Sequence, residues 1–149
     1  MRTLCFTFAP ALFFAAEGNN KQASLHFQRS IELFPFQTSK GNAYEKLAQV
    51  YEKLGDRKAA AETLEALVKL DENNLTATKL LADYWETQAN PARTLEMLQL
   101  AFFINPFEYS LHARAGEIYL SSGDFALGLR EFQVALALEP RTSQKPTII

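Results

Sequence analysis

YEKLAQVYEKLGDRKAA, residues 44–60, predicts two amphipathic helices separated by a break at Gly55-Asp56. Leu47, Val50 and Leu54 recur at helical spacing before the break. Glycine readily adopts the left-handed conformation that ends a helix, and an aspartate side chain can accept hydrogen bonds from the free amides that begin the next one. The segment therefore predicts a helical hairpin.

The same break recurs along the chain. Gly123-Asp124 follows the first break by 68 residues, which is twice 34, and Asn90-Pro91 occupies the intermediate position as an N-cap followed by a first-turn proline. Three segments align without a gap and share columns of large apolar and small residues: 41–74, 75–108 and 109–142. A period of this length indicates a stacked array of helical hairpins.

These units resemble the tetratricopeptide repeat (TPR) family, whose 34-residue pattern is Trp-x2-Leu-Gly-x2-Tyr, then Ala-x3-Phe, then Pro. The matching positions are Tyr44, Leu47, Ala48, Tyr51, Ala60 and Leu64; Leu81, Ala82, Trp85, Thr94, Leu98, Ala101 and Pro106; and His112, Ala115, Gly116, Tyr119, Gly128, Phe132, Ala135 and Pro140. Small residues at Ala48, Ala82 and Gly116 allow the two helices of each unit to approach closely. The resemblance implies an all-α, right-handed α-solenoid of antiparallel helix-turn-helix repeats.

A degenerate unit over residues 4–37 precedes the three clear ones, with Phe14, Gly18, Ala23, Phe27, Ser30 and Pro35 in the expected columns. We therefore expect a single TPR-like domain over residues 1–142 and a disordered tail at 143–149. Pro10 lies where the first helix of this unit should be continuous. Because proline removes a helix hydrogen bond, we expect that helix to be short or frayed.

The apolar N-terminus, MRTLCFTFAPALFFAA, also resembles a secretory signal. Phe14 would lie at −3 for cleavage after Ala16, and the repeat phase gives the segment a packing role, so we favour a structural helix. It is too short, and too interrupted by Pro10, to cross a bilayer. The compartment stays open: a cytoplasmic location is slightly favoured, and a secreted or periplasmic one would follow if the run is a signal.

Composition and motifs argue against several classes of function. The 149 residues carry a net charge of −2, from 17 acidic and 15 basic side chains, so there is no positive excess for nucleic acid binding. Cys5 has no disulfide partner, and His26 and His112 have no second metal ligand at i+3 or i+4. No HExxH, GxSxG, GxxxxGK or GxGxxG motif is present. We expect no enzymatic activity, no cofactor and no metal.

The TPR resemblance directs attention to the concave surface lined by the first helix of each unit. Counting on the repeat phase gives ten predicted groove positions for partner binding: Asn42, Glu45, Gln49, Glu52, Thr76, Lys79, Asp83, Glu86, Ser110 and Glu117. Five are acidic and one is basic, and the Lys, Asn and Arg residues with which some family members hold a peptide carboxylate are not reproduced. We expect a protein or peptide partner with a basic and apolar segment. A solvated helix face is the alternative interpretation.

The last predicted helix, FALGLREFQVALALEP, carries apolar residues on its expected outer side, at Leu127, Val134 and Ala137. Repeat arrays normally end in a helix with a polar outer face. The chain is thus predicted to be a fragment of a longer array, to self-associate here, or to dock a partner here. We expect a non-enzymatic protein-interaction scaffold. The alternatives are a repeat segment of a larger enzyme, such as a peptidase or transferase, and a homo-oligomerisation module.

Overall fold

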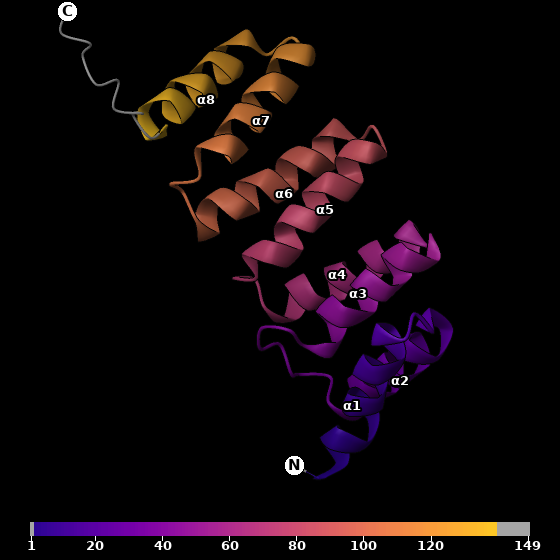
Figure 1. Cartoon of the computed structure of the whole chain (residues 1–149). Coiled ribbons are helices and arrows are strands. Elements are labelled where there is room, and N and C mark those ends of the chain that lie inside the picture. Colours follow the sequence, from indigo (N-terminus) through magenta and orange to yellow (C-terminus); the bar gives the residue numbers. More distant parts are fainter. Residues whose placement is uncertain (1, 140–149) are drawn as a thin grey trace, which may run out of the picture. The chain divides into compact units, whose positions relative to one another are not determined.

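A computed structural model describes the backbone of residues 2–139 and the side chains of residues 7–139. Over these residues every regular element is an α-helix, and successive helices form antiparallel pairs joined by short turns (Figure 1). The eight helices within this range are α1 (Arg2–Ala16), α2 (Asn20–Leu33), α3 (Ala43–Leu54), α4 (Arg57–Leu70), α5 (Leu75–Thr87), α6 (Pro91–Ile104), α7 (Tyr109–Ser121) and α8 (Phe125–Leu138). The predicted all-α class is confirmed.

The turn between α3 and α4 shows how the sequence ends one helix and starts the next. Gly55 has a φ of 79° and closes α3, and the Asp56 N–H donates to the Tyr51 carbonyl at 2.9 Å. The Asp56 side chain then accepts a hydrogen bond from the Ala59 N–H at 3.0 Å. Both predicted roles, C-terminal glycine and N-terminal cap, are confirmed.

The turn between α5 and α6 also uses a residue in the left-handed conformation, but here that residue is an alanine, for which the conformation is unfavourable. Ala89 stands at the repeat position of Gly55 and adopts the same left-handed conformation, with a φ of 50°. A left-handed conformation costs an alanine about 1–2 kcal/mol, because its Cβ crowds the following carbonyl. Asn90 then caps α6, as predicted, by accepting from the Arg93 N–H at 3.1 Å.

The core lies between the helices and is built of small and aliphatic side chains. Ala48 and Ala82, in the small-residue column of the repeats, are 3% and 0% exposed. Gly116 occupies the same column in α7, and a Cβ placed there would lie 3.0 Å from the Phe132 ring of α8. A small residue at this column therefore lets the two helices of a unit come into direct contact.

The first helix corrects one expectation from the sequence. We predicted a short or frayed helix because of Pro10, but α1 runs continuously from Arg2 to Ala16 with Pro10 inside it. Pro10 leaves one carbonyl of the preceding turn without its helix partner. Ala11 and Phe14 pack in the same cluster as the buried Phe27 of α2, and this apolar burial offsets the lost hydrogen bond.

The described residues divide into two compact units, one extending to Met97 and one beginning at Leu98, so the boundary falls inside α6. In the first unit α1 packs on α2, α2 on α3, α3 on α4, and α4 on α5; in the second, α7 packs on α8. Between residues 2 and 139 no helix combines the length and apolar character needed to cross a membrane. The predicted tail at 143–149 lies outside the described residues.

Candidate functional site

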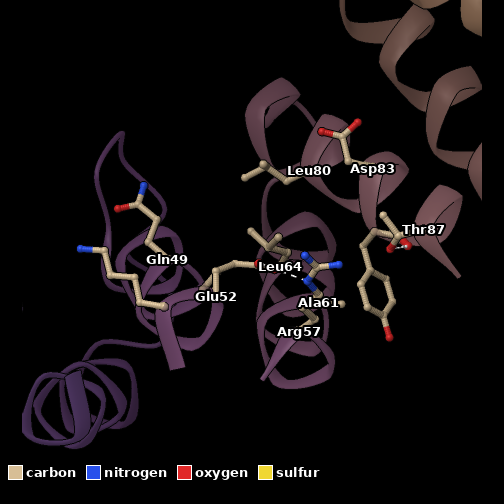
Figure 2. Close-up of a pocket in the computed structure, with 11 residues that line it drawn as sticks. Gln49, Glu52, Arg57, Ala61, Leu64, Leu80, Asp83 and Thr87 are labelled. Carbon is tan, nitrogen blue, oxygen red and sulfur yellow. Dashed lines mark hydrogen bonds and ion pairs between the residues drawn. The ribbon is translucent and has the colours of Figure 1, made fainter. Parts of the chain in front are cut away.

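The first unit contains a pocket with a volume of about 520 Å³ between α3, α4 and α5 (Figure 2). We call it the α3–α5 pocket. Its lining residues come from all three helices: Ala48, Gln49, Glu52, Lys53, Arg57, Ala61, Leu64, Leu80, Asp83, Tyr84 and Thr87. Since α3 and α5 are the first helices of two successive repeats, the pocket lies where one repeat stacks on the next.

The pocket combines an apolar floor with a polar rim. Ala48, Ala61 and Leu64 are buried beneath it, and Leu80 of α5 is 43% exposed beside them. Gln49 on the rim is solvent-exposed and carries an amide that can both donate and accept hydrogen bonds. An apolar floor with a few polar groups is typical of sites that hold one anchoring side chain of a ligand.

Charges of both signs surround this floor. Glu52 and Asp83 are acidic, whereas Lys53 and Arg57 are basic, so the charges at the rim balance. Arg57 Nε lies 3.9 Å from Glu52 Oε2, and both side chains are more than half exposed. At that distance and exposure an ion pair contributes little stability, and a competing cation can displace it.

The structure brings only part of the predicted groove set to this pocket. Gln49, Glu52 and Asp83 line it. Thr76 and Glu86 are exposed on α5, Lys79 is half-buried there, and Ser110 and Glu117 are exposed on α7 in the second unit. Sequence counting missed the two basic rim residues, because they fall at the end of α3 and the start of α4, next to the turn.

Asn42 and Glu45 have roles inside the fold. Asn42 is 4% exposed; its side chain caps α3 by accepting from the Glu45 N–H at 3.0 Å and donates to the Thr38 carbonyl at 3.1 Å. The Glu45 carboxylate accepts from the Gly41 N–H at 2.8 Å and from Asn74 Nδ2 at 3.1 Å. Because Asn74 caps α5, Glu45 joins the starts of two successive repeats.

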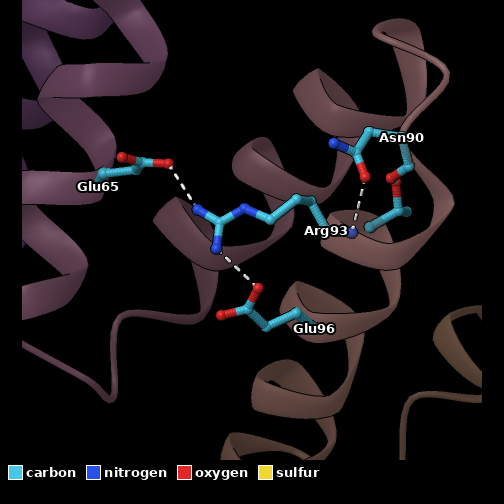
Figure 3. Close-up of polar contacts among 5 residues, drawn as sticks. Glu65, Asn90, Arg93 and Glu96 are labelled. Carbon is cyan, nitrogen blue, oxygen red and sulfur yellow. Dashed lines mark hydrogen bonds and ion pairs between the residues drawn. The ribbon is translucent and has the colours of Figure 1, made fainter.

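Arg93 joins α6 to α4 in the same unit (Figure 3). Its guanidinium donates to Glu65 at 3.0 Å and to Glu96 at 2.7 Å, and lies 5.0 Å from the centre of the Trp85 ring. Burial lowers the pKa of Arg93, but its hydrogen bonds and charge interactions with Glu96 and Glu65 outweigh this effect and leave that pKa above its ordinary value. The Arg93 guanidinium is a fixed cation that ties α6 to α4.

Tyr44 anchors the segment before α3. Its hydroxyl donates to the Pro35 carbonyl at 2.8 Å, and its side chain lines a second pocket of about 560 Å³ between α2, α3 and α4. Burial raises the pKa of the Tyr44 phenol, because removing the phenolate from water is unfavourable. The second pocket is shallow, and its lining contains no lysine or arginine, so it has fewer kinds of group that could bind a ligand than the first pocket.

His112 is a packing residue within the second unit. It is 8% exposed, and its ring stacks on Phe102 with centroids 4.2 Å apart. Nδ1 lies 2.7 Å from a Glu131 carboxylate oxygen, and Nε2 lies 3.2 Å from the Pro106 carbonyl. Both ring nitrogens therefore serve the fold. Among the described residues no group of three or more His, Cys, Asp or Glu side chains could hold a metal ion.

On α8 the exposed apolar residues only partly match the predicted set. Leu127 is 36% exposed, Val134 is half-buried and Ala137 is exposed. The most exposed apolar side chains on this helix were missed: Phe125, Leu129 and Leu136, at 69%, 60% and 73%. These residues are spaced four and seven positions apart, so the helical periodicity could have indicated them. However, α8 has apolar residues on two sides, and the sequence alone does not show which side packs against α7.

Comparison with known proteins supports this architecture. Residues 41–74 match the family model for the tetratricopeptide repeat. The chain is 27% identical over 126 residues to anaphase-promoting complex subunit 3 of Schizosaccharomyces pombe; the match covers 85% of this chain and 18% of that protein. The chain thus spans less than a fifth of the length of this curated relative.

Solved structures of MamA have a similar fold. One MamA crystal structure matches with a TM-score of 0.73 and 18% identity, covering 93% of this chain and 74% of the other. A MamA structure from Desulfovibrio magneticus RS-1 matches with a TM-score of 0.65 and 22% identity, covering 89% and 73% respectively. At these identities the likeness concerns the fold, and it confirms the predicted class, an all-α solenoid of helical hairpins.

Proposed function

We propose that the α3–α5 pocket binds an extended segment of a partner protein without catalysis; the tetratricopeptide repeat match at residues 41–74 and the fold of stacked helical hairpins support a role as a protein-interaction scaffold. The observation that supports this most directly is the combination of an apolar floor and a polar rim at a junction between two repeats. Extended segments lack internal hydrogen bonds, so they need backbone partners as well as a place for a side chain.

The chemistry of the pocket defines the segment it would take. An apolar side chain of the partner rests on Ala48, Leu64 and Leu80, where it loses contact with water. The Gln49 amide bonds the partner backbone. A lysine or arginine one or two residues away approaches Glu52, whose pairing with Arg57 is long and solvent-exposed and therefore weak.

The test is a selection of binding peptides from a displayed random library of about 12-residue segments, with the intact chain as bait. Affinities of the selected peptides are then measured by fluorescence anisotropy. We expect the selected peptides to share a basic residue close to an apolar one. Glu52→Lys and Leu80→Glu should each weaken their binding at least tenfold, about 1.4 kcal/mol.

Glu72→Lys is the matched control, since it makes the same charge change at an exposed position outside the pocket. It should change affinity less than twofold at moderate salt, where distant charges are screened. Selected peptides that bind Glu52→Lys and Leu80→Glu as tightly as the original chain would refute the pocket as the binding site.

A further inference from the structure

The face of α8 that remains exposed is apolar along its length. Phe125, Leu129 and Leu136 follow one another at spacings of four and seven residues, so they form a single stripe. Leu120 of α7, 41% exposed, lies beside it, since its side chain approaches Gly128 of α8. Exposed apolar side chains of this size, arranged in a stripe, are typical of a surface that packs against another helix.

The repeat itself shows which helix such a stripe receives. In the alignment of residues 41–74 with 109–142, Phe125 and Leu129 correspond to Arg57 and Ala61 of α4. Those two α4 residues line the α3–α5 pocket opposite four residues of the following helix, α5: Leu80, Asp83, Tyr84 and Thr87. The part of the α8 stripe formed by Phe125 and Leu129 therefore corresponds to the α4 surface that faces the first helix of the next repeat, α5.

The α1 helix carries the matching surface. The positions of Leu80, Asp83, Tyr84 and Thr87 in residues 75–108 correspond to Ala9, Leu12, Phe13 and Ala16 in residues 4–37. All four are exposed, Leu12 at 41% and Phe13 at 61%, and all four are apolar. Between residues 3 and 16 the sequence has no charged residue, so this part of the helix brings no charge of its own into the interface.

We propose that α1 of one copy of the chain packs on the α7–α8 face of a second copy, continuing between molecules the stacking that α4 and α5 make within one. Polar and charged residues of α4 and α5 leave an open pocket at that internal junction. The corresponding residues of α8 and α1 are all apolar and close most of the intermolecular junction; on α7 the corresponding positions hold Gly116, Glu117, Leu120 and Ser121. This interface uses different surfaces on the two partners, so each pair leaves one α1 and one α8 available for further copies.

The test is the solution mass by light scattering from about 1 to about 200 µM, a range suited to the micromolar affinity of a single-helix interface. The first variant, Leu129→Glu/Leu136→Glu, blocks the α8 stripe; the second, Leu12→Glu/Phe13→Glu, blocks α1. Each alone should remain at the monomer mass of 16.8 kDa. An equimolar mixture should form a dimer and nothing larger, because it has one intact α1 and one intact α8 surface.

Two controls separate this interface from general stickiness. Ala137→Glu changes an exposed residue of α8 outside the stripe, and Leu25→Glu removes a 57% exposed leucine from α2. Both should associate like the original chain. Circular dichroism checks that each variant is helical; if a glutamate pair unfolds the chain, serine at the same two positions replaces it.

The masses of the original chain, the two variants and their mixture distinguish the possible interfaces. A mixed dimer from two monomeric variants supports it. It is overturned if the original chain stays monomeric at all concentrations. Self-association of the α1 variant alone would instead show α8 pairing with α8, and self-association of the α8 variant alone would show α1 pairing with α1. Equal loss of association in the controls would show that no single face is responsible.

Discussion

Replacing Glu45 with alanine should destabilise the chain, although this residue is among the acidic positions of the partner-binding groove predicted from the sequence. The carboxylate is half-buried and accepts from the Gly41 backbone N–H and from the Asn74 amide. It also stands in the first turn of α3, where a negative charge interacts favourably with the helix dipole. Removing it leaves two donors without their partner.

The magnitude follows from these three interactions. A hydrogen bond to a charged group contributes about 1.5–3 kcal/mol when buried, and a neutral one about 1 kcal/mol. Solvent reaches the half-buried Glu45, which reduces the charged contributions, so the sum is about 2 kcal/mol. For a chain of this size that corresponds to a fall of about 4–8 °C in melting temperature.

Urea unfolding followed by circular dichroism measures the loss, and Glu52→Ala provides the control on the same helix. Within the described part of the chain, the Glu52 carboxylate makes the long contact to Arg57 and no other ion pair, so its removal should cost less than about 0.5 kcal/mol. Asn74→Ser keeps an oxygen that can cap α5 but removes the amide donor. In a double-mutant cycle with Glu45→Ala it should show a coupling of about 1 kcal/mol. Equal, small losses for both glutamates and no coupling to Asn74 would refute this reasoning.

Three further substitutions test other contacts. Arg93→Met should cost about 1–2 kcal/mol in urea unfolding, more than Glu65→Gln, and 1 M salt should reduce the difference, since the Arg93 side chain is 38% exposed. Ala89→Gly should raise stability by about 0.5 kcal/mol in the same assay, because glycine removes the left-handed strain at a smaller entropic cost. Burial raises the pKa of Tyr44, so the unfolded chain ionises first; stability should fall as pH rises above about 10, and Tyr44→Phe should weaken that fall in melts at matched pH.

Much of the fold could be predicted from the sequence because its determinants are local and repeated. Gly55 and Asp56 act through their own backbone conformation and the adjacent amides, so their roles follow from residue type alone. The small column of Ala48 and Ala82 recurs every 34 residues, and such a recurrence indicates a packing requirement without any knowledge of the neighbours.

The candidate site was less predictable, because its residues depend on neighbours distant in the chain. Glu45 pairs with Asn74, 29 residues further on, and nothing in either local sequence shows that contact. The exposed face of α8 was predicted only in part, for a related reason. Two sides of that helix carry apolar residues. The close contact of Gly128 with α7 determines which side is covered. The result is an exposed stripe centred on Leu129 and not on Val134.

The α1 helix, which carries no charge after Arg2, has a consequence for synthesis on the ribosome. Its inward-facing apolar side chains, among them Ala11 and Phe14, pack in one cluster with Phe27 of α2 and with Leu47 and Val50 of α3. About 40 residues separate the end of α1 from the end of α3, which at 5–20 residues per second takes about 2–8 s to translate. During that interval the nascent helix has no complete surface to fold against. The rate at which translation reaches α3 therefore governs how long this apolar segment stays uncovered.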